Sequence, residues 1–301
     1  MSTTTDITRA EYCVTACADI FTGAGEIMAS PMAPVPLLGA RLARLTTEPD
    51  LLITDGECLI LADTPPIGKV GPTEGWMPFP KVFDVVASGR RHVVMGANQV
   101  DRFGNQNLSA FGPLQHPTRQ MFGSRGAPGN TINHPTSYWV PRHSNRVFVE
   151  KVDIVCGVGY DKVDPTNPAF DYLHIHRVVS NLGVFDFSGP DHTMRALSLH
   201  PGVTAADVAE NSSFEIVGLD EAPEVDRRLP DVLAAQGKTI EVEHTLRPLV
   251  VGAAVEVPLH IAALERQRCA CLIDASHDLV QAAVDPHATS GALEPASLEA
   301  I

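Results

Sequence analysis

Two carboxylates stand directly after a short apolar run, a position where α/β enzymes often hold a reactive group. Residues 51–54 break abruptly into Asp55, Gly56 and Glu57. A carboxylate at such a strand end can attack a carbonyl as a nucleophile or activate a water as a general base. It can equally be the polar end of a buried strand. The residues alone leave both interpretations open.

A second concentration of polar groups lies in residues 96–112, GANQVDRFGNQNLSAFG, which follow the apolar run HVVMG. Glycine permits close backbone approach and positive φ, while Asn and Gln offer both donors and acceptors. Such a loop suits an elongated polar ligand; alternatively, its side chains form Asx-turns that hold a surface loop. Residues 128–139, PGNTINHPTSYW, repeat this chemistry. The candidate ligand-binding residues are Gly96, Asn98, Gln99, Asp101, Gly104, Asn105, Asn107, Gly129, Asn130 and Asn133.

Histidine and cysteine patterns give weaker signals. His174 and His176 lie two apart on an expected strand and so face one side, but no third or fourth ligand is evident. Polar residues on one strand face are therefore favoured over a metal site. Cys13 and Cys17 fall on the apolar stripe of a helix, which favours core packing, and the C-A-C sequence at 269–271 lacks a partner pair at zinc-finger spacing. We expect reduced thiols in a cytoplasmic protein and no metal.

Composition and missing motifs exclude several classes of protein. The 301-residue chain has a net charge of −14, which argues against binding to nucleic acid or to anionic membranes. It has no apolar run long enough to span a bilayer, and its N-terminus is not typical of a secretory signal. There is no G-x-S-x-G elbow, no P-loop and no G-x-G-x-x-G that opens a helix. The fragment Gly157-Val-Gly159 is more typical of a tight turn.

The elements that must position these residues alternate between helices and strands in the first half of the chain. Thr8 and Glu11 form a capping box before an apolar stripe, which predicts a helix, and a third capped helix is expected to start at Thr204. A second helix is expected near residues 37–45. Strands are expected at 26–29, 51–54, 92–96, 147–150, 152–159, 173–179, 183–187 and 194–200, with long loops at 97–119 and 123–145. This order predicts an α/β domain over residues 1–222 with a mixed sheet, followed by an extension, 223–301, that is partly disordered.

Several segments, in the right order, resemble the β subunit of family I CoA-transferases. Residues 96–107 resemble the family signature G-A-x-Q-V-D-x-x-G-N-x-N, and Gly129 and Asn133 match its P-G-x-G-G-A-N-D-like loop, whose second Gly and Asp are absent here. The segments 37–53, 177–187 and 199–208 resemble its helix–strand unit, a later strand and its P-G-V-T helix start. The segments EGWMPFP, at 74–80, and NTINHPTSYWV, at 130–140, are similar to one subgroup, the actinobacterial ring-cleaving hydrolases of cholesterol catabolism.

The resemblance, which spans roughly residues 10–220, implies a CoA-transferase-like (NagB/RpiA-type) fold with an open mixed, mainly parallel sheet flanked by helices. It also implies an acyl-CoA substrate, no cofactor besides the CoA of that substrate, and an α-subunit partner in an α2β2 assembly. The active site is then expected at the α–β interface. The loops at 96–107 and 129–134 are expected to shape the acyl-CoA pocket. Residues 240–275 have no counterpart in the family.

Ordinary family members use a β-subunit glutamate, placed before a Gly, as covalent nucleophile. Here Asp55 precedes the Gly and Glu57 follows it, and attack geometry tolerates little displacement, so neither residue holds the family position. We therefore expect no catalytic residue on this chain. The expected reaction is hydrolytic C–C cleavage of a cyclic β-keto acyl-CoA, with a glutamate of the α subunit as general base. The alternatives are a true CoA-transferase that uses Asp55 or Glu57, and a non-catalytic scaffold subunit.

Overall fold

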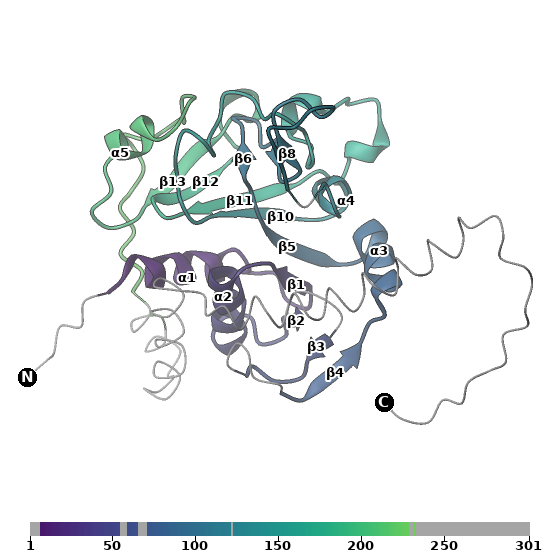
Figure 1. Cartoon of the computed structure of the whole chain (residues 1–301). Coiled ribbons are helices and arrows are strands. Elements are labelled where there is room, and N and C mark those ends of the chain that lie inside the picture. Colours follow the sequence, from purple (N-terminus) through teal and green to yellow (C-terminus); the bar gives the residue numbers. More distant parts are fainter. Residues whose placement is uncertain (1–6, 55–58, 66–70, 122, 229–231, 233–301) are drawn as a thin grey trace, which may run out of the picture. The chain divides into compact units, whose positions relative to one another are not determined.

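The computed structural model describes residues 7–54, 59–65, 71–121, 123–228 and 232. A nine-stranded sheet runs through this part of the chain (Figure 1). Its strand order is β13 (Arg195–Leu199), β12 (Gly183–Asp186), β11 (Ile175–Ser180), β10 (Thr136–Val140), β5 (Arg91–Gly96), β1 (Met28–Pro31), β2 (Leu52–Thr54), β3 (Leu59–Leu61) and β4 (Thr73–Trp76). The central strands from β11 to β2 are parallel, and antiparallel strands extend the sheet at both edges. The predicted open mixed sheet is confirmed.

Five α-helices, three short 3-10 helices and two small hairpins accompany the sheet in the described residues. The α-helices are α1 (Arg9–Asp19), α2 (Pro34–Leu45), α3 (Phe79–Ser88), α4 (Ala127–Asn133) and α5 (Ala205–Glu210). The hairpins are β6 (Gln99–Val100) with β7 (Gln106–Asn107), and β8 (Ala110–Phe111) with β9 (Arg119–Gln120). None of the helices in these ranges is long and apolar enough to cross a membrane.

The two N-terminal helices cover one face of the sheet. The capping box predicted at Thr8 and Glu11 opens α1, because each residue satisfies a backbone N–H of the other. Cys13 and Cys17 are buried in the core between α1, α2 and the strands, as their spacing predicts. A Cβ at Gly39 of α2 would lie 2.6 Å from the Cβ of Cys17, so the close approach of the two helices requires glycine there.

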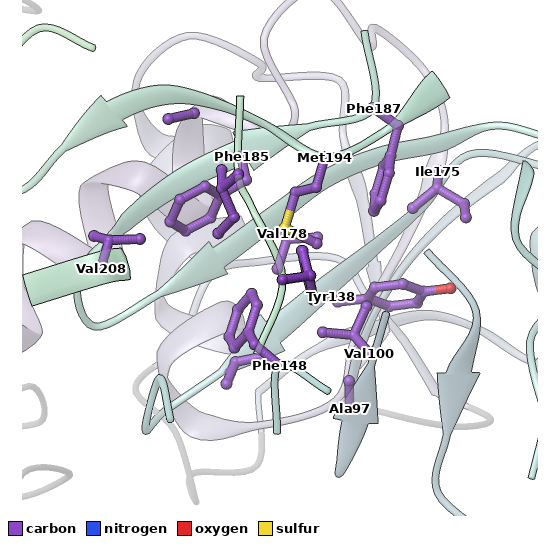
Figure 2. Close-up of a cluster of buried hydrophobic side chains, with 14 of the residues drawn as sticks. Ala97, Val100, Tyr138, Phe148, Ile175, Val178, Phe185, Phe187, Met194 and Val208 are labelled. Carbon is purple, nitrogen blue, oxygen red and sulfur yellow. The ribbon is translucent and has the colours of Figure 1, made fainter. Parts of the chain in front are cut away.

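The opposite face packs on a second core (Figure 2). Side chains alternate along β5, so that Val94 belongs to the core under α1 and α2, while Val93 and Met95 belong to the second core. Tyr138 and Phe185, from β10 and β12, are fully buried in it. Both faces of the central strands are therefore covered, as expected of parallel strands.

Two predicted strands are absent, and one central strand was missed. Residues 147–150 and 152–159 form no strand; they pair with the β6–β7 hairpin at the isolated bridges Val100–Phe148 and Gln106–Gly157 and contact it through side-chain hydrogen bonds such as the one from the N–H of Asp153 to Gln99 Oε1. Phe148 and Cys156 instead lie in the second core, with Val147 and Ile154 packed against it, and Phe148 is fully buried. The predicted loop 123–145 contains α4 and β10. The segment before β10 is rich in Pro and Asn, which is typical of a loop, and the strand was therefore not predicted.

The domain boundary expected near residue 222 stays a prediction. The described chain continues to residue 228 and packs against α1: the Tyr12 hydroxyl donates to Asp226 Oδ1 at 2.8 Å, and Arg227 pairs with Asp19 at 2.7 Å. Residues 233–301, which include the C-A-C sequence, lie outside the described part of the chain.

Candidate functional site

The polar loop predicted to bind a ligand begins at the carboxyl end of β5, in the middle of the parallel strands. Ligands of open α/β sheets bind beyond the carboxyl ends of the strands. We call this side the carboxyl edge; it includes Met32 after β1 and Thr54 at the end of β2. Asp55 and Glu57, which follow Thr54, lie outside the described residues.

The loop folds back onto the end of β5 through backbone and amide hydrogen bonds. The N–H of Asn98 donates to the carbonyl of Asn107 at 3.0 Å, and Gln106 Nε2 donates to the carbonyl of Gly96 at 2.6 Å. Gln99 Oε1 accepts from Asn107 Nδ2 at 2.7 Å and from the N–H of Asp153 at 2.9 Å. Gln99 and Asn107 are buried, so these amides are bound within the chain.

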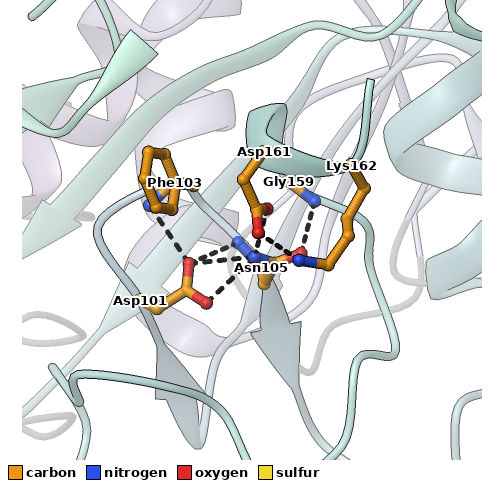
Figure 3. Close-up of polar contacts among 6 residues, drawn as sticks. All are labelled: Asp101, Phe103, Asn105, Gly159, Asp161 and Lys162. Carbon is orange, nitrogen blue, oxygen red and sulfur yellow. Dashed lines mark hydrogen bonds and ion pairs between the residues drawn. The ribbon is translucent and has the colours of Figure 1, made fainter. Parts of the chain in front are cut away.

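Asp101 and Asn105 form the centre of the loop (Figure 3). Asp101 Oδ1 accepts from the N–H groups of Phe103 at 3.1 Å and Asn105 at 3.0 Å, which is an Asx-type turn. Asn105 Nδ2 donates to Asp101 Oδ2 at 2.9 Å and to Asp161 Oδ1 at 2.7 Å, while its Oδ1 accepts from the N–H of Gly159 at 2.9 Å. Burial raises the pKa of Asp101 above its ordinary value, against the lowering effect of these hydrogen bonds. This cluster determines the shape of the loop.

Gly104 completes the turn by its backbone conformation. Its φ is +85°, and a Cβ there would lie 2.6 Å from Ile175 Cδ1 and 2.9 Å from Phe187. Both the left-handed conformation and the lack of space require glycine. Gly104 therefore serves the close packing of the loop on β11.

The second predicted block lies on α4 and joins that helix to its neighbours. A Cβ at Gly129 would lie 2.7 Å from Val86 of α3, and Asn133 Nδ2 donates to the carbonyl of Val86 at 3.0 Å. Asn130 is buried and its Oδ1 accepts from Arg91 Nη1 at 2.7 Å. Because α4 ends just before the amino end of β10, Asn133 lies at the amino ends of the strands. The structure does not bring this block to the carboxyl edge.

Of the ten candidates, Gly96 and Asn98 are the exposed ones. A Cβ added at Gly96 meets no atom within 4 Å, so open space adjoins the end of β5. Contact with a ligand stays a prediction for all ten, and these two have the accessibility that it needs. The other eight already have hydrogen-bond partners or close packing contacts within the chain.

Gln106 belongs to the same loop but is not among the ten candidates. It is fully buried, its Nε2 is bound to Gly96, and its Oε1 has no hydrogen-bond partner among the described residues. The position of a Cβ at Gly157 lies 3.3 Å from this oxygen. The sequence signal that could have indicated Gln106 is its place between Asn105 and Asn107. Its burial could not be predicted, because that depends on the approach of residues 156–159 in the folded chain.

Histidines cluster on the face under α1 rather than at the carboxyl edge. The rings of His174 and His176 meet edge to face at 5.3 Å, which agrees with their predicted placement on one side, and His92 lies 5.4 Å from His176. Burial, with Arg177 and His174, lowers the pKa of His176 to about 4. Within the described ranges, no group of three or more His, Cys, Asp or Glu side chains could hold a metal ion.

Comparisons with known proteins agree with this fold. No family model matches the chain. It is 78% identical, over 220 residues, to the cholesterol ring-cleaving hydrolase IpdB subunit of Rhodococcus jostii, a match that covers 73% of this chain and 87% of that protein. The crystal structure of Rhodococcus jostii RHA1 IpdAB matches with a TM-score of 0.74 and 75% identity, over 76% of this chain and 92% of that one.

A more distant solved structure extends the likeness to the wider fold. Glutaconate coenzyme A-transferase from Acidaminococcus fermentans matches with a TM-score of 0.62 at 22% identity, over 76% of this chain and 94% of that chain, which shows a shared fold. The resemblance drawn from the motifs at 96–107 and 130–140 is thus confirmed. The chain belongs to the family of the cholesterol ring-cleaving hydrolase IpdB subunits, whose members have the CoA-transferase fold.

Proposed function

We propose that this chain is the β subunit of a hydrolase that opens a ring in a cyclic β-keto acyl-CoA from steroid catabolism. The observation that carries the proposal is the 78% identity to a ring-cleaving hydrolase subunit over 87% of that subunit's length. Identity at this level across nearly the whole relative favours the same reaction over one that shares only the fold.

The reaction is a hydrolytic retro-Claisen cleavage. A glutamate of the α subunit removes a proton from water as the water oxygen attacks the ring ketone. The bond between that carbon and the adjacent α-carbon then breaks, and its electron pair forms the thioester enolate. Protonation of the enolate leaves a carboxylate and an opened acyl-CoA. Hydrogen-bond donors near the former ketone oxygen stabilise the charge that develops on it.

This chain contributes walls and polar contacts to the pocket, and none of its residues is assigned a catalytic role. Gly96 and Asn98 are the groups best placed to meet the acyl-CoA, because both are exposed at the carboxyl edge. The buried Asp101–Asn105 pair holds the loop that carries them. The exposed backbone of Gly96 permits an approach that a larger residue would hinder.

The proposal includes an α-subunit partner, an α2β2 assembly and an acyl-CoA site at the α–β interface. Its support is the likeness to the two-subunit IpdAB structure. No cofactor is proposed besides the CoA of the substrate. A net charge of −14 disfavours nucleic acid and anionic membranes as partners. We place the protein in the cytoplasm, since Cys13, Cys17 and Cys156 are free thiols.

A direct test uses the complex of this chain with its α subunit. The complex is incubated with a cyclic β-keto acyl-CoA in ¹⁸O-water, and the product is analysed by mass spectrometry. Hydrolysis adds one ¹⁸O atom to the new carboxylate and retains the thioester. A true CoA-transferase instead forms an acyl-enzyme on Asp55 or Glu57 that borohydride or hydroxylamine traps on this chain. Such trapping, or no ring opening by a folded complex, would refute the proposal.

The scaffold alternative is tested with Asn98→Ala in the same complex. We expect KM for the acyl-CoA to rise about ten-fold, because a polar contact with bound substrate is lost. Asn167→Ala is the matched control: this asparagine is also exposed, but it caps a short helix (Pro168–Phe170) that precedes the amino end of β11. Unchanged KM and kcat for Asn98→Ala would favour a scaffold role for this loop.

A further inference from the structure

A surface hollow of about 400 Å³ lies at the amino ends of the parallel strands, the end opposite to the carboxyl edge. It sits at the amino ends of β1, β5, β10 and β11, away from the exposed candidates Gly96 and Asn98. Its polar lining includes Arg90, Arg91, Asn133, His134, Asp171 and His174. Its volume lies in the range typical of small-molecule sites.

Arg91 is a buried cation without an anionic partner in the described part of the chain. It is 4% exposed, and its guanidinium donates to the neutral acceptors Ser30 Oγ at 2.9 Å and Asn130 Oδ1 at 2.7 Å. No carboxylate of the described residues pairs with it, and its Nη2 donates to none of them. Burial lowers the pKa of Arg91 to about 10, so the side chain remains charged at pH 7. A buried charge held only by neutral groups is costly, and an anion beside it would offset that cost.

His134 adds a second unsatisfied group to the same wall of the hollow. It is 3% exposed, and its Nε2 lies 3.4 Å from Arg91 Nη1 and 3.2 Å from Asn130 Oδ1. Its Nδ1 is buried and has no partner among the described residues. Burial and the neighbouring Arg91 lower the pKa of His134 to about 4, so the ring is neutral at pH 7. The two contacts of Nε2 belong to two tautomers: with the proton on Nε2 the ring donates to Asn130 Oδ1 and Nδ1 is an acceptor, whereas with the proton on Nδ1 the ring accepts from Arg91. An anion beside Nδ1 selects the second tautomer, because its Nδ1 proton has no acceptor among the described residues.

We propose that this hollow binds a small oxyanion, of the phosphate or carboxylate class, that pairs with Arg91 and accepts a hydrogen bond from His134. Arg90 adds positive charge at the rim. Asp171, an exposed carboxylate in the lining, weakens the binding of an anion but forms no ion pair that would neutralise Arg91. The site is independent of the proposed acyl-CoA pocket, because the two lie at opposite ends of the parallel strands.

The test titrates the purified α–β complex with inorganic phosphate, and separately with acetate, at constant ionic strength maintained with chloride. We expect saturable binding by calorimetry and a matching rise in Tm with phosphate or acetate. Arg91→Gln weakens that binding at least ten-fold, since a charge-assisted contact is lost. Asp171→Asn strengthens it about two-fold. Arg102→Gln is the control, since Arg102 pairs with Glu150 outside the hollow, and it leaves anion binding unchanged.

Three outcomes would overturn the proposal. The first is the absence of saturable anion binding to the assembled complex, as expected when Arg91 serves only to join β1 and α4 or when a carboxylate of the α subunit fills the hollow. The second is binding that Arg91→Gln and Asp171→Asn both leave unchanged, which identifies an adventitious ion only. The third outcome concerns the case in which Arg91→Gln does not fold. The test then rests on Asp171→Asn and His134→Gln, and the proposal fails if neither variant alters the affinity for the anion.

Discussion

Asn105→Ala separates the two roles that a polar loop can have. Asn105 is 1% exposed and its amide connects Asp101, Asp161 and the backbone N–H of Gly159. Loss of one such buried hydrogen bond costs about 1 kcal/mol, and a buried partner left unsatisfied adds to this. Three partners give an expected loss of about 3 kcal/mol in the free energy of unfolding. For a domain of this size that corresponds to a fall in Tm of roughly 6–12 °C.

The measurement is thermal unfolding of the assembled complex, followed by circular dichroism, with steady-state kinetics below the transition. We expect Asn105→Ala to lower Tm by several degrees and to alter KM only through the loosened loop. Asn98→Ala, the matched variant, changes an exposed side chain of the same loop and leaves Tm within about 1 °C. Asn105→Ala with an unchanged Tm and a strongly raised KM would refute our assignment of Asn105 to the structure of the loop.

Three further variants or conditions have definite expected outcomes. Gly104→Ala destabilises the complex by more than about 2 kcal/mol in urea unfolding, because its φ is +85° and its Cβ would meet Ile175; a loss below 0.5 kcal/mol would contradict this. Burial lowers the pKa of His143 to about 3. On acidification this side chain is therefore protonated near pH 6.5 in the unfolded chain but stays neutral in the folded chain until about pH 3. The contribution of His143 to the free energy of unfolding is therefore complete above pH 6.5 and falls by up to about 1.4 kcal/mol per pH unit towards pH 3. We expect His143→Gln to reduce the slope of unfolding free energy against pH by one proton in this range. An unchanged slope would show that His143 titrates normally. Burial raises the pKa of Cys13 to about 12 and that of Cys17 further, so both thiols react with a disulfide reagent only after unfolding; rapid labelling of the native complex would exclude the core packing described here.

Much of the fold follows from local sequence patterns. The capping boxes at Thr8 and Thr204 start α1 and α5 where they were predicted, because the capping groups lie three residues apart. β5 and β11 also lie close to their predicted ranges, since continuous apolar runs are typical of strands buried on both faces. β10 was missed because its five residues follow a short helix that Pro128 helps to start, and a loop composition surrounds both.

The candidate site was predictable in kind but not in detail. The sequence showed that the loop after β5 is rich in amides and glycine and lies at a strand end, and the motif order identified the family. The sequence did not show that Phe148 belongs to no strand and packs in the second core. It also did not show that residues 153–161 lie against the loop after β5.

What the sequence determined by itself is chemistry within a few residues: the capping boxes at Thr8 and Thr204 and a carboxylate pair displaced from the family's nucleophile position. For residues 96–112 it left open whether the side chains form Asx-turns or contact a ligand. Only the tertiary structure decided which amides remain available. Asn98 and Asn105 are the same residue type in one loop, yet Asn105 is bound by Asp161 and Gly159 while Asn98 stays exposed. The reason is that an amide is satisfied by whichever donor or acceptor arrives within about 3 Å, and partners more than 50 residues away arrive only through packing.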